Sequence, residues 1–243
     1  MLALQMPRVG DADQLTLAIG TRLYDDAGRE KAAFRLGQIH YFKDRRVTLQ
    51  GAPTLDELVP HSALTGEASY QLAERWRASS YVEWNTSTER ADVGSVQLNY
   101  QSDANHLVNL AWRYREMPPP RYVNGFDTRI DQSDISAVWP LKGNWNLVGR
   151  WDYDYSNKRT LEGILGFEYG TCCWRVRLVA RSWIDSQSLL YGVKDNNTGV
   201  FVQFELKGLG SLLGGNVNGI LNNGISGFRD RNNDRNNAGI GNF

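Results

Sequence analysis

Residues 173–183 read CWRVRLVARSW. The apolar side chains of this stretch share one face of an extended chain: Trp174, Val176, Leu178 and Ala180. The arginines share the other face: Arg175, Arg177 and Arg181. Successive side chains of a β-strand point to opposite faces, so this period of two predicts a strand with one apolar and one charged face. The same pattern recurs along most of the chain and decides the expected fold.

Ten further stretches show the same alternation or a close variant, so the sequence predicts about eleven strands. They cover residues 14–24, 31–50, 64–72, 76–86, 93–100, 106–115, 134–139, 145–155, 161–169, 173–183 and 198–207. Several place charges on the second face, as Arg150, Asp152 and Asp154 do. A soluble β-sandwich or propeller turns such charges to water, whereas a transmembrane barrel turns them to a wet lumen and its apolar face to lipid.

Two other features favour the membrane. Short connections alternate with mostly longer ones, as in outer-membrane barrels with short periplasmic turns. Many of the 8 Trp and 11 Tyr residues stand at strand ends, as an interfacial girdle requires. The expected fold class is therefore all-β: an antiparallel transmembrane β-barrel segment over residues 14–207. No stretch of 18 apolar residues suggests a helical span.

The two ends of the chain differ from this core. No signal peptide is visible in the first ten residues, and a strand pattern begins soon after them. We therefore expect residues 1–13 to be a truncated lead-in and the chain to be a fragment. Residues 208–243 are rich in Gly and Asn, and we expect a flexible, disordered low-complexity tail.

The only two cysteines are adjacent, at Cys172 and Cys173. A bridge between neighbouring residues is strained, so either both thiols are free and inert or their partners lie outside this chain. They fall in a short turn, which the barrel interpretation places in the periplasm. Cysteines in that oxidising compartment tend to be paired.

Chemistry-bearing motifs are weak. Asp152 and Asp154 beside Arg150 resemble an acid/base or cation-binding pair, but a solvated lumenal face explains them better. The three histidines lie in different segments, and no nucleophile with a base and an orienting group is visible. Charges balance at 27 of each sign, which gives no sign of a nucleic-acid partner. We expect no enzyme, no cofactor and no metal site.

Four stretches carry a family resemblance: TRLYDDA at 21–27, FRLGQIHYF at 34–42, the cysteine pair, and FELKGL at 204–209. In this order and spacing they resemble the C-terminal part of the lipopolysaccharide assembly protein D family (LptD, or organic solvent tolerance protein), over about residues 14–210. The adjacent cysteines before the final strand are the most specific element.

The resemblance implies a large outer-membrane barrel in Gram-negative bacteria, preceded by a periplasmic jelly-roll domain that this chain lacks. It implies that Cys172 and Cys173 form disulfides with cysteines outside this chain. It also implies an outer-membrane lipoprotein plug (LptE-like) in the lumen, a periplasmic bridge protein that delivers lipopolysaccharide to the missing domain, and a periplasmic location for the tail and short turns.

The last strand would then form one side of a lateral gate through which lipopolysaccharide leaves. The gate residues are Thr198, Val200, Val202, Phe204 and Leu206. Lumenal arginines are candidate contacts for lipopolysaccharide phosphates or a partner, although such arginines more often pair with facing acids such as Glu162 and Glu168. They are Arg175, Arg177 and Arg181. A general porin or solute channel, or a soluble β-rich carbohydrate-binding protein, remains as an alternative.

Overall fold

The structure is a computed structural model that describes residues 13–43, 59–103, 105–117, 121–123, 125–184, 196–206, 210–213 and 216–228. Its elements are β1 (Gln14–Tyr24), β2 (Glu30–Tyr41), β3 (Leu64–Ala73), β4 (Trp76–Asn85), β5 (Arg90–Asp103), β6 (His106–Arg115), β7 (Tyr122–Val123), β8 (Phe126–Asp127), β9 (Ile130–Pro140), β10 (Trp145–Asp154), β11 (Arg159–Gly170), β12 (Trp174–Trp183), β13 (Asn197–Leu206), β14 (Gly210–Leu213) and α2 (Asn216–Gly224). In this described part, no helix combines the length and the apolar character needed to cross a membrane.

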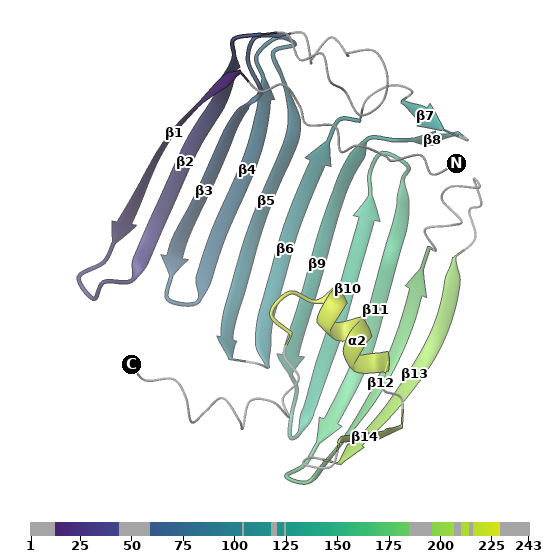
Figure 1. The fold of residues 1–243 in the computed structure, drawn as a ribbon. Coiled ribbons are helices and arrows are strands. Elements are labelled where there is room, and N and C mark those ends of the chain that lie inside the picture. The colour runs from purple at the N-terminus through teal and green to yellow at the C-terminus, as the bar shows by residue number, and fades with distance from the viewer. Residues whose placement is uncertain are drawn as a thin grey trace, which may run out of the picture. The chain divides into compact units, whose positions relative to one another are not determined.

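The eleven predicted strands correspond to the eleven long strands, and the all-β antiparallel fold is confirmed (Figure 1). The boundaries differ most at two strands. The second strand ends at Tyr41, and residues 44–50 of its predicted range lie outside the described residues. The strand predicted to begin at residue 134 begins at Ile130, directly after the small β7–β8 hairpin, which the sequence did not predict.

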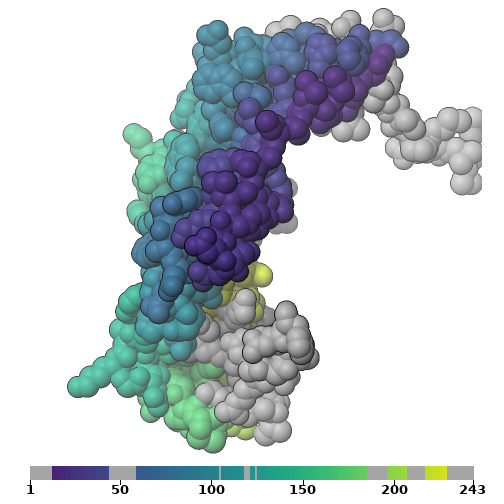
Figure 2. All heavy atoms as spheres, turned by 90° about the vertical axis from the view of Figure 1, so that its left-hand side faces the viewer, coloured from purple at the N-terminus to yellow at the C-terminus, as the bar shows by residue number. Residues whose placement is uncertain are grey.

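The chain divides into two compact units, and β3, β4 and β5 each contribute residues to both. The first unit comprises residues 1–70 and 80–94, with strand order β1-β2-β3-β4-β5. Leu36 of β2 lies opposite Ile19 of β1 and Gly66 of β3 in the antiparallel register. β1 is the edge strand, and its purple surface faces the viewer in Figure 2.

The second unit comprises residues 71–79 and 95–243, with strand order β5-β6-β9-β10-β11-β12-β13-β14. Its register aligns one inner row of side chains across six strands. The row consists of Leu107, Val138, Val148, Gly166, Val179 and Phe201. Four of these side chains are almost fully buried, so the row forms an apolar strip on the inner face.

The two faces of the second unit have inverted polarity. Large apolar side chains are exposed on the outer face: Leu110, Trp112, Ile135, Trp151, Leu165, Phe167, Leu178, Val200 and Val202. Polar and charged side chains are buried on the inner face: Asn109, Ser136, Asn146, Asp152, Asp154, Glu168, Arg175, Arg177, Gln203 and Glu205. A water-soluble sheet has the opposite arrangement, whereas a segment of a membrane barrel has this one.

Aromatic side chains form a row at the end of the second unit that holds the short turns. Rings of β10, β11, β12 and β13 follow one another there at centroid separations of 4.9 to 6.2 Å. They belong to Trp145, Tyr169, Trp174 and Phe204. The predicted clustering of Trp and Tyr at strand ends is therefore present in the fold, in the position of an interfacial girdle.

The prediction of a disordered tail is wrong for its described residues. Gly210–Leu213 forms β14, and Asn216–Gly224 forms α2 on the inner face of the second unit (Figure 1). Val217, Leu221 and Ile225 recur every four residues and are 0–1% exposed. This helical period gives α2 one apolar stripe, which the Gly/Asn-rich composition concealed. Residues 1–12 and 229–243 lie outside the described residues.

Gly166 interrupts the inner row, and its neighbours leave no space for a side chain at this position. A Cβ at this position would lie 2.9 Å from Val179 Cγ2 and 3.0 Å from the Leu178 carbonyl oxygen. The backbone oxygen cannot move cheaply, so Gly166→Val should destabilise the protein by about 1–3 kcal/mol through overpacking. Gly163→Val is the matched control, because a Cβ at Gly163 on the same strand would meet nothing within 4 Å. Urea midpoints of the purified protein in detergent measure both variants, and equal midpoints would contradict this packing.

Candidate functional site

The cysteine turn joins β11 to β12 and is held by Thr171. The Thr171 amide donates to the Trp174 carbonyl oxygen at 2.9 Å, and its hydroxyl oxygen accepts from the amides of Cys173 and Trp174 at 3.4 Å each. These bonds fix the backbone of the turn. Both cysteine side chains are exposed. The turn therefore presents two adjacent cysteine side chains at the surface.

A buried ion network lies beside this turn on the inner face. Arg177 Nε donates to Glu168 Oε2 at 2.7 Å, and Arg177 Nη1 donates to Gln203 Oε1 at 2.9 Å. Arg175 lies 3.8 Å from both Glu168 and Glu205. Two arginines and two glutamates thus balance in charge while all are at most 3% exposed. Burying such charges is tolerable only when they are paired, so the network connects β11, β12 and β13 as one unit.

A second network continues along the inner face. Arg150 of β10 pairs with Asp134 at 2.6 Å and contacts Asp152 at 3.4 Å. It also pairs with Glu162, which accepts a further bond from Arg181 Nε at 2.6 Å. Asp152 extends this network to β6 by accepting a hydrogen bond from Arg113 at 3.0 Å.

The carboxylates singled out from the sequence are thus held in structural ion pairs. Asp152 belongs to the Arg150 network, and Asp154 contacts Asn157 and Arg159 at 2.9 and 3.6 Å. The structure does not bring Asp152 and Asp154 together as an isolated acid/base pair. Across the described ranges, no group of three or more His, Cys, Asp or Glu side chains has the arrangement of a metal site.

The three arginines predicted to contact lipopolysaccharide or a partner differ in accessibility. The side chains of Arg175 and Arg177 are 3% and 1% exposed, whereas that of Arg181 is 27% exposed. All three pair with acids on β11, as expected for lumenal arginines: Arg175 and Arg177 with Glu168, and Arg181 with Glu162. Arg181 is therefore the one most open to a ligand in the lumen.

The last long strand, β13, pairs along its whole length with β12 on one edge. On its other edge, β14 pairs only with Phe204, Glu205 and Leu206. Among the described residues, no strand pairs with this edge over residues 197–203. Val200 and Val202 point outward and are 69% and 57% exposed. Phe204 and Leu206 are half-buried, and Lys207 of the predicted strand lies outside the described residues.

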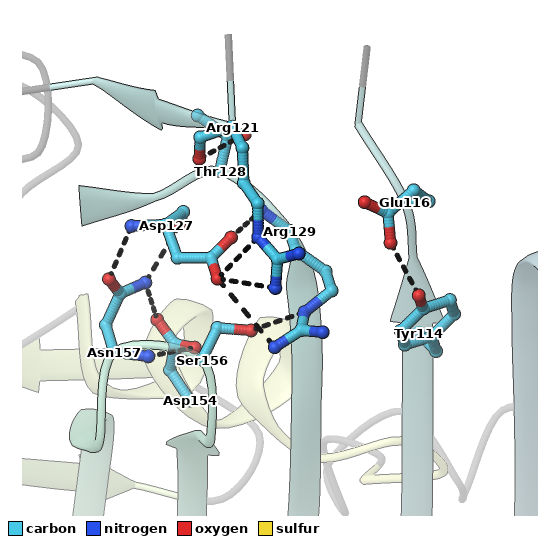
Figure 3. A network of polar contacts seen from close by, with 9 residues as sticks. All are labelled: Tyr114, Glu116, Arg121, Asp127, Thr128, Arg129, Asp154, Ser156 and Asn157. Carbon is cyan, nitrogen blue, oxygen red and sulfur yellow. Dashed lines mark hydrogen bonds and ion pairs between the residues drawn. The ribbon is translucent and has the colours of Figure 1, made fainter. Parts of the chain in front are cut away.

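A polar network that the sequence did not predict connects the loop before β9 to the turn between β10 and β11 (Figure 3). Asn157 accepts from the Asp127 amide at 2.9 Å and donates to the Asp127 carbonyl oxygen at 3.0 Å. Asp127 also accepts from Arg121 at 3.3 Å, and its charge raises the pKa of the Arg121 guanidinium. The density of Asp, Asn and Arg in both segments was the available signal. The network fixes the loop at the rim of the sheet.

Comparison with known proteins identifies relatives of the chain. A family model described as LPS transport system D (LptD) matches residues 6–145. The LPS-assembly protein LptD of Pseudomonas aeruginosa (strain LESB58) is 38% identical over 254 residues, and that of Pseudomonas putida (strain GB-1) is 36% identical over 253 residues. Each alignment covers 92% of this chain, and the chain spans 27% of the length of these relatives. A solved NanC porin structure has a TM-score of 0.32 and 10% identity, over 80% of this chain and 95% of its own, which is too weak to inform the fold.

Arg177→Ala tests the buried network. Removing one partner leaves the charge of Glu168 buried with less compensation, so we expect a loss of about 3–5 kcal/mol in the free energy of unfolding. Arg35→Ala is the control, because the Arg35–Glu67 pair at 3.5 Å is half exposed or more and should contribute less than about 1 kcal/mol. Denaturant unfolding of both purified variants gives the two values. A similar small loss in both would mean that the Arg177 network does not hold the strands together.

Proposed function

Because the chain belongs to the LptD family of LPS transport proteins, we propose that it is part of the outer-membrane translocon that inserts lipopolysaccharide into the outer leaflet of Gram-negative bacteria. The observation that carries the proposal is the inverted polarity of the strands of the second unit, with apolar side chains outside and paired charges inside. In this proposal the eleven long strands form one part of the barrel wall, and the lumen lies on their charged face.

The lateral gate is assigned to β13. Residues 197–203 of β13 have no partner on the edge away from β12 among the described strands, and in this proposal another strand of the barrel wall pairs there to close the wall. The lipid side of the seam would be lined by the outward-facing Thr198, Val200 and Val202. The end of the seam beside the cysteine turn would hold Phe204 and Leu206.

The cysteine turn is the proposed tether. Its two exposed side chains would bond cysteines of a periplasmic segment outside this chain, and the hydrogen bonds of Thr171 fix the backbone of the turn that carries them. A tether at this turn would fix the periplasmic jelly-roll domain beside the ends of the last strands. The proposed partners are the periplasmic bridge protein, acting through that domain, and an outer-membrane lipoprotein plug (LptE-like) in the lumen.

The wall itself is proposed to act passively. Arg175 and Arg177 are committed to the buried network, which makes them structural members of the wall. Arg181 is the proposed contact for a phosphate group of lipopolysaccharide or for a partner, since its guanidinium is partly exposed beside Glu162. The energy for transport would come from other components of the pathway.

Leu178→Arg tests whether the outer face meets lipid. An arginine at mid-strand in a bilayer costs about 2–4 kcal/mol, so this variant should accumulate less folded protein in the outer membrane. Leu141→Arg is the matched control, because Leu141 lies in a short turn with similar exposure, 44% against 46% for Leu178. The folded fraction is measured by heat-modifiable electrophoresis of membrane extracts. Equal folded fractions would place the outer face in water and contradict the proposal.

The double variant Cys172→Ser/Cys173→Ser tests the tether. In the full-length protein, we expect the wild type to change mobility on reduction and the double variant to lack that change. Strains that carry only the double variant should also show reduced lipopolysaccharide at the cell surface. Thr171→Ser is the control, because it retains the hydroxyl that holds the turn. If reduction does not change the mobility of the wild-type protein, the cysteine turn is not a disulfide tether.

A further inference from the structure

The residues that follow the last long strand form two attachments to the second unit. We define the C-terminal strap as residues 210–213 (β14) and 216–228 (α2 and the turn after it). The first attachment is an antiparallel pairing that sets Gly210, Ser211 and Leu213 opposite Leu206, Glu205 and Phe204. β14 thereby occupies one end of the open edge of β13. That end lies beside the cysteine turn, because Leu206 is the register partner of Trp174.

The second attachment lies where α2 crosses the inner face (Figure 1), and the apolar wall side chains that pack against it form its seat. The seat and the strap share one hydrophobic cluster with contributions from five strands. Its strap members are Val217, Leu221, Ile225 and Phe228, and its wall members are Leu107, Val138, Val148, Ile164 and Val179. Burial removes the apolar surface of these side chains from water, so the strap is a firmly packed part of the fold.

Polar contacts align the strap with the buried network. Asn109 Nδ2 of β6 donates to the Ser226 carbonyl oxygen at 2.8 Å. Arg177 contacts Asn218 Oδ1, and its guanidinium carbon lies 5.8 Å from the centre of the Phe228 ring. The same arginine bonds Gln203 of β13. The strap is therefore linked to the last strand through Arg177 as well as through β14.

One glycine sets how closely α2 approaches the wall. A Cβ at Gly224 would lie 3.3 Å from Ile164 Cδ1 and 3.5 Å from Arg150 Cδ. A Cβ at Gly219, in the same helix, would meet nothing within 4 Å. A bulky residue at position 224 should therefore push α2 off the wall, while the same residue at position 219 should leave it seated.

We propose that the C-terminal strap caps the edge of β13 at its cysteine-turn end, so that pairing and opening of the barrel seam are confined to residues 197–203 of β13. Backbone groups on the edge of Phe204–Leu206 already bond β14, so another wall strand cannot pair with them or part from them there. Because α2 packs on five wall strands, the strap would keep β14 in place while residues 197–203 of β13 part from their neighbour. This proposal rests on the proposed function in one respect, that the seam is the exit for lipopolysaccharide.

The test compares Gly224→Leu with Gly219→Leu in the full-length protein. Both replace a helical glycine with a good helix former, so any gain in helix propensity is shared. Hydrogen exchange of the amides of residues 217–225 reports whether α2 stays seated, independently of transport. Susceptibility of the cells to vancomycin, which a closed outer membrane excludes, reports whether the seam leaks. Leu221→Ala, which removes a fully buried side chain, is the second variant if Gly224→Leu does not fold.

We expect Gly224→Leu to exchange at least tenfold faster over residues 217–225 and to raise vancomycin susceptibility several-fold, with Gly219→Leu unchanged in both. Faster exchange with unchanged susceptibility would overturn the strap, and unchanged exchange would overturn its seat. A second experiment, in which the cells are depleted of the whole protein, tests the proposed function separately from the strap. If depletion of the whole protein leaves surface lipopolysaccharide unchanged, the transport function fails, whatever the two glycine variants show.

Discussion

The pairing of buried charges on the inner face is the constraint on which the second unit depends. The antiparallel register fixes which side chains face one another, and it places Arg177 beside Glu168 and Gln203. A shift by one residue would turn these charges outward and the apolar side chains inward. Lipid outside would not tolerate the charges, and the paired network would be lost. The ion pairs therefore favour one register as much as they stabilise the strands.

This constraint also connects the features proposed to act in transport. Arg177 contacts the last strand through Gln203 and the strap through Asn218, and its strand begins directly after the cysteine turn. The tether, the seam and the strap thus meet at one end of β12 and β13. A disulfide formed at the turn would fix one side of this junction, and the seat of α2 fixes the other. Under the proposal, the part of β13 that moves is residues 197–203, with which β14 does not pair.

The sequence predicted the strands well because period-two alternation follows directly from strand geometry. Arg177 and Leu178 fall on opposite faces in both the prediction and the structure. It also placed the cysteines in a tight turn. The prediction for the strap was wrong, because the Gly/Asn-rich composition suggests disorder and conceals the four-residue spacing of Val217, Leu221 and Ile225. The partners of each lumenal charge, such as Arg150 with Asp134 and Glu162, depend on register between distant strands, which alternation within one strand cannot give.

The proposed translocon requires that one face of these strands meets lipid and the other meets the lumen. Neighbouring residues of β11 separate the two environments, because Leu165 is 55% exposed on the outer face and Ile164 is 4% exposed under α2. A benzoylphenylalanine placed at each position in living cells tests this directly. The account predicts a photo-adduct with lipid from position 165 and an adduct within the protein from position 164. Lipid adducts from position 164, or none from position 165, would contradict it.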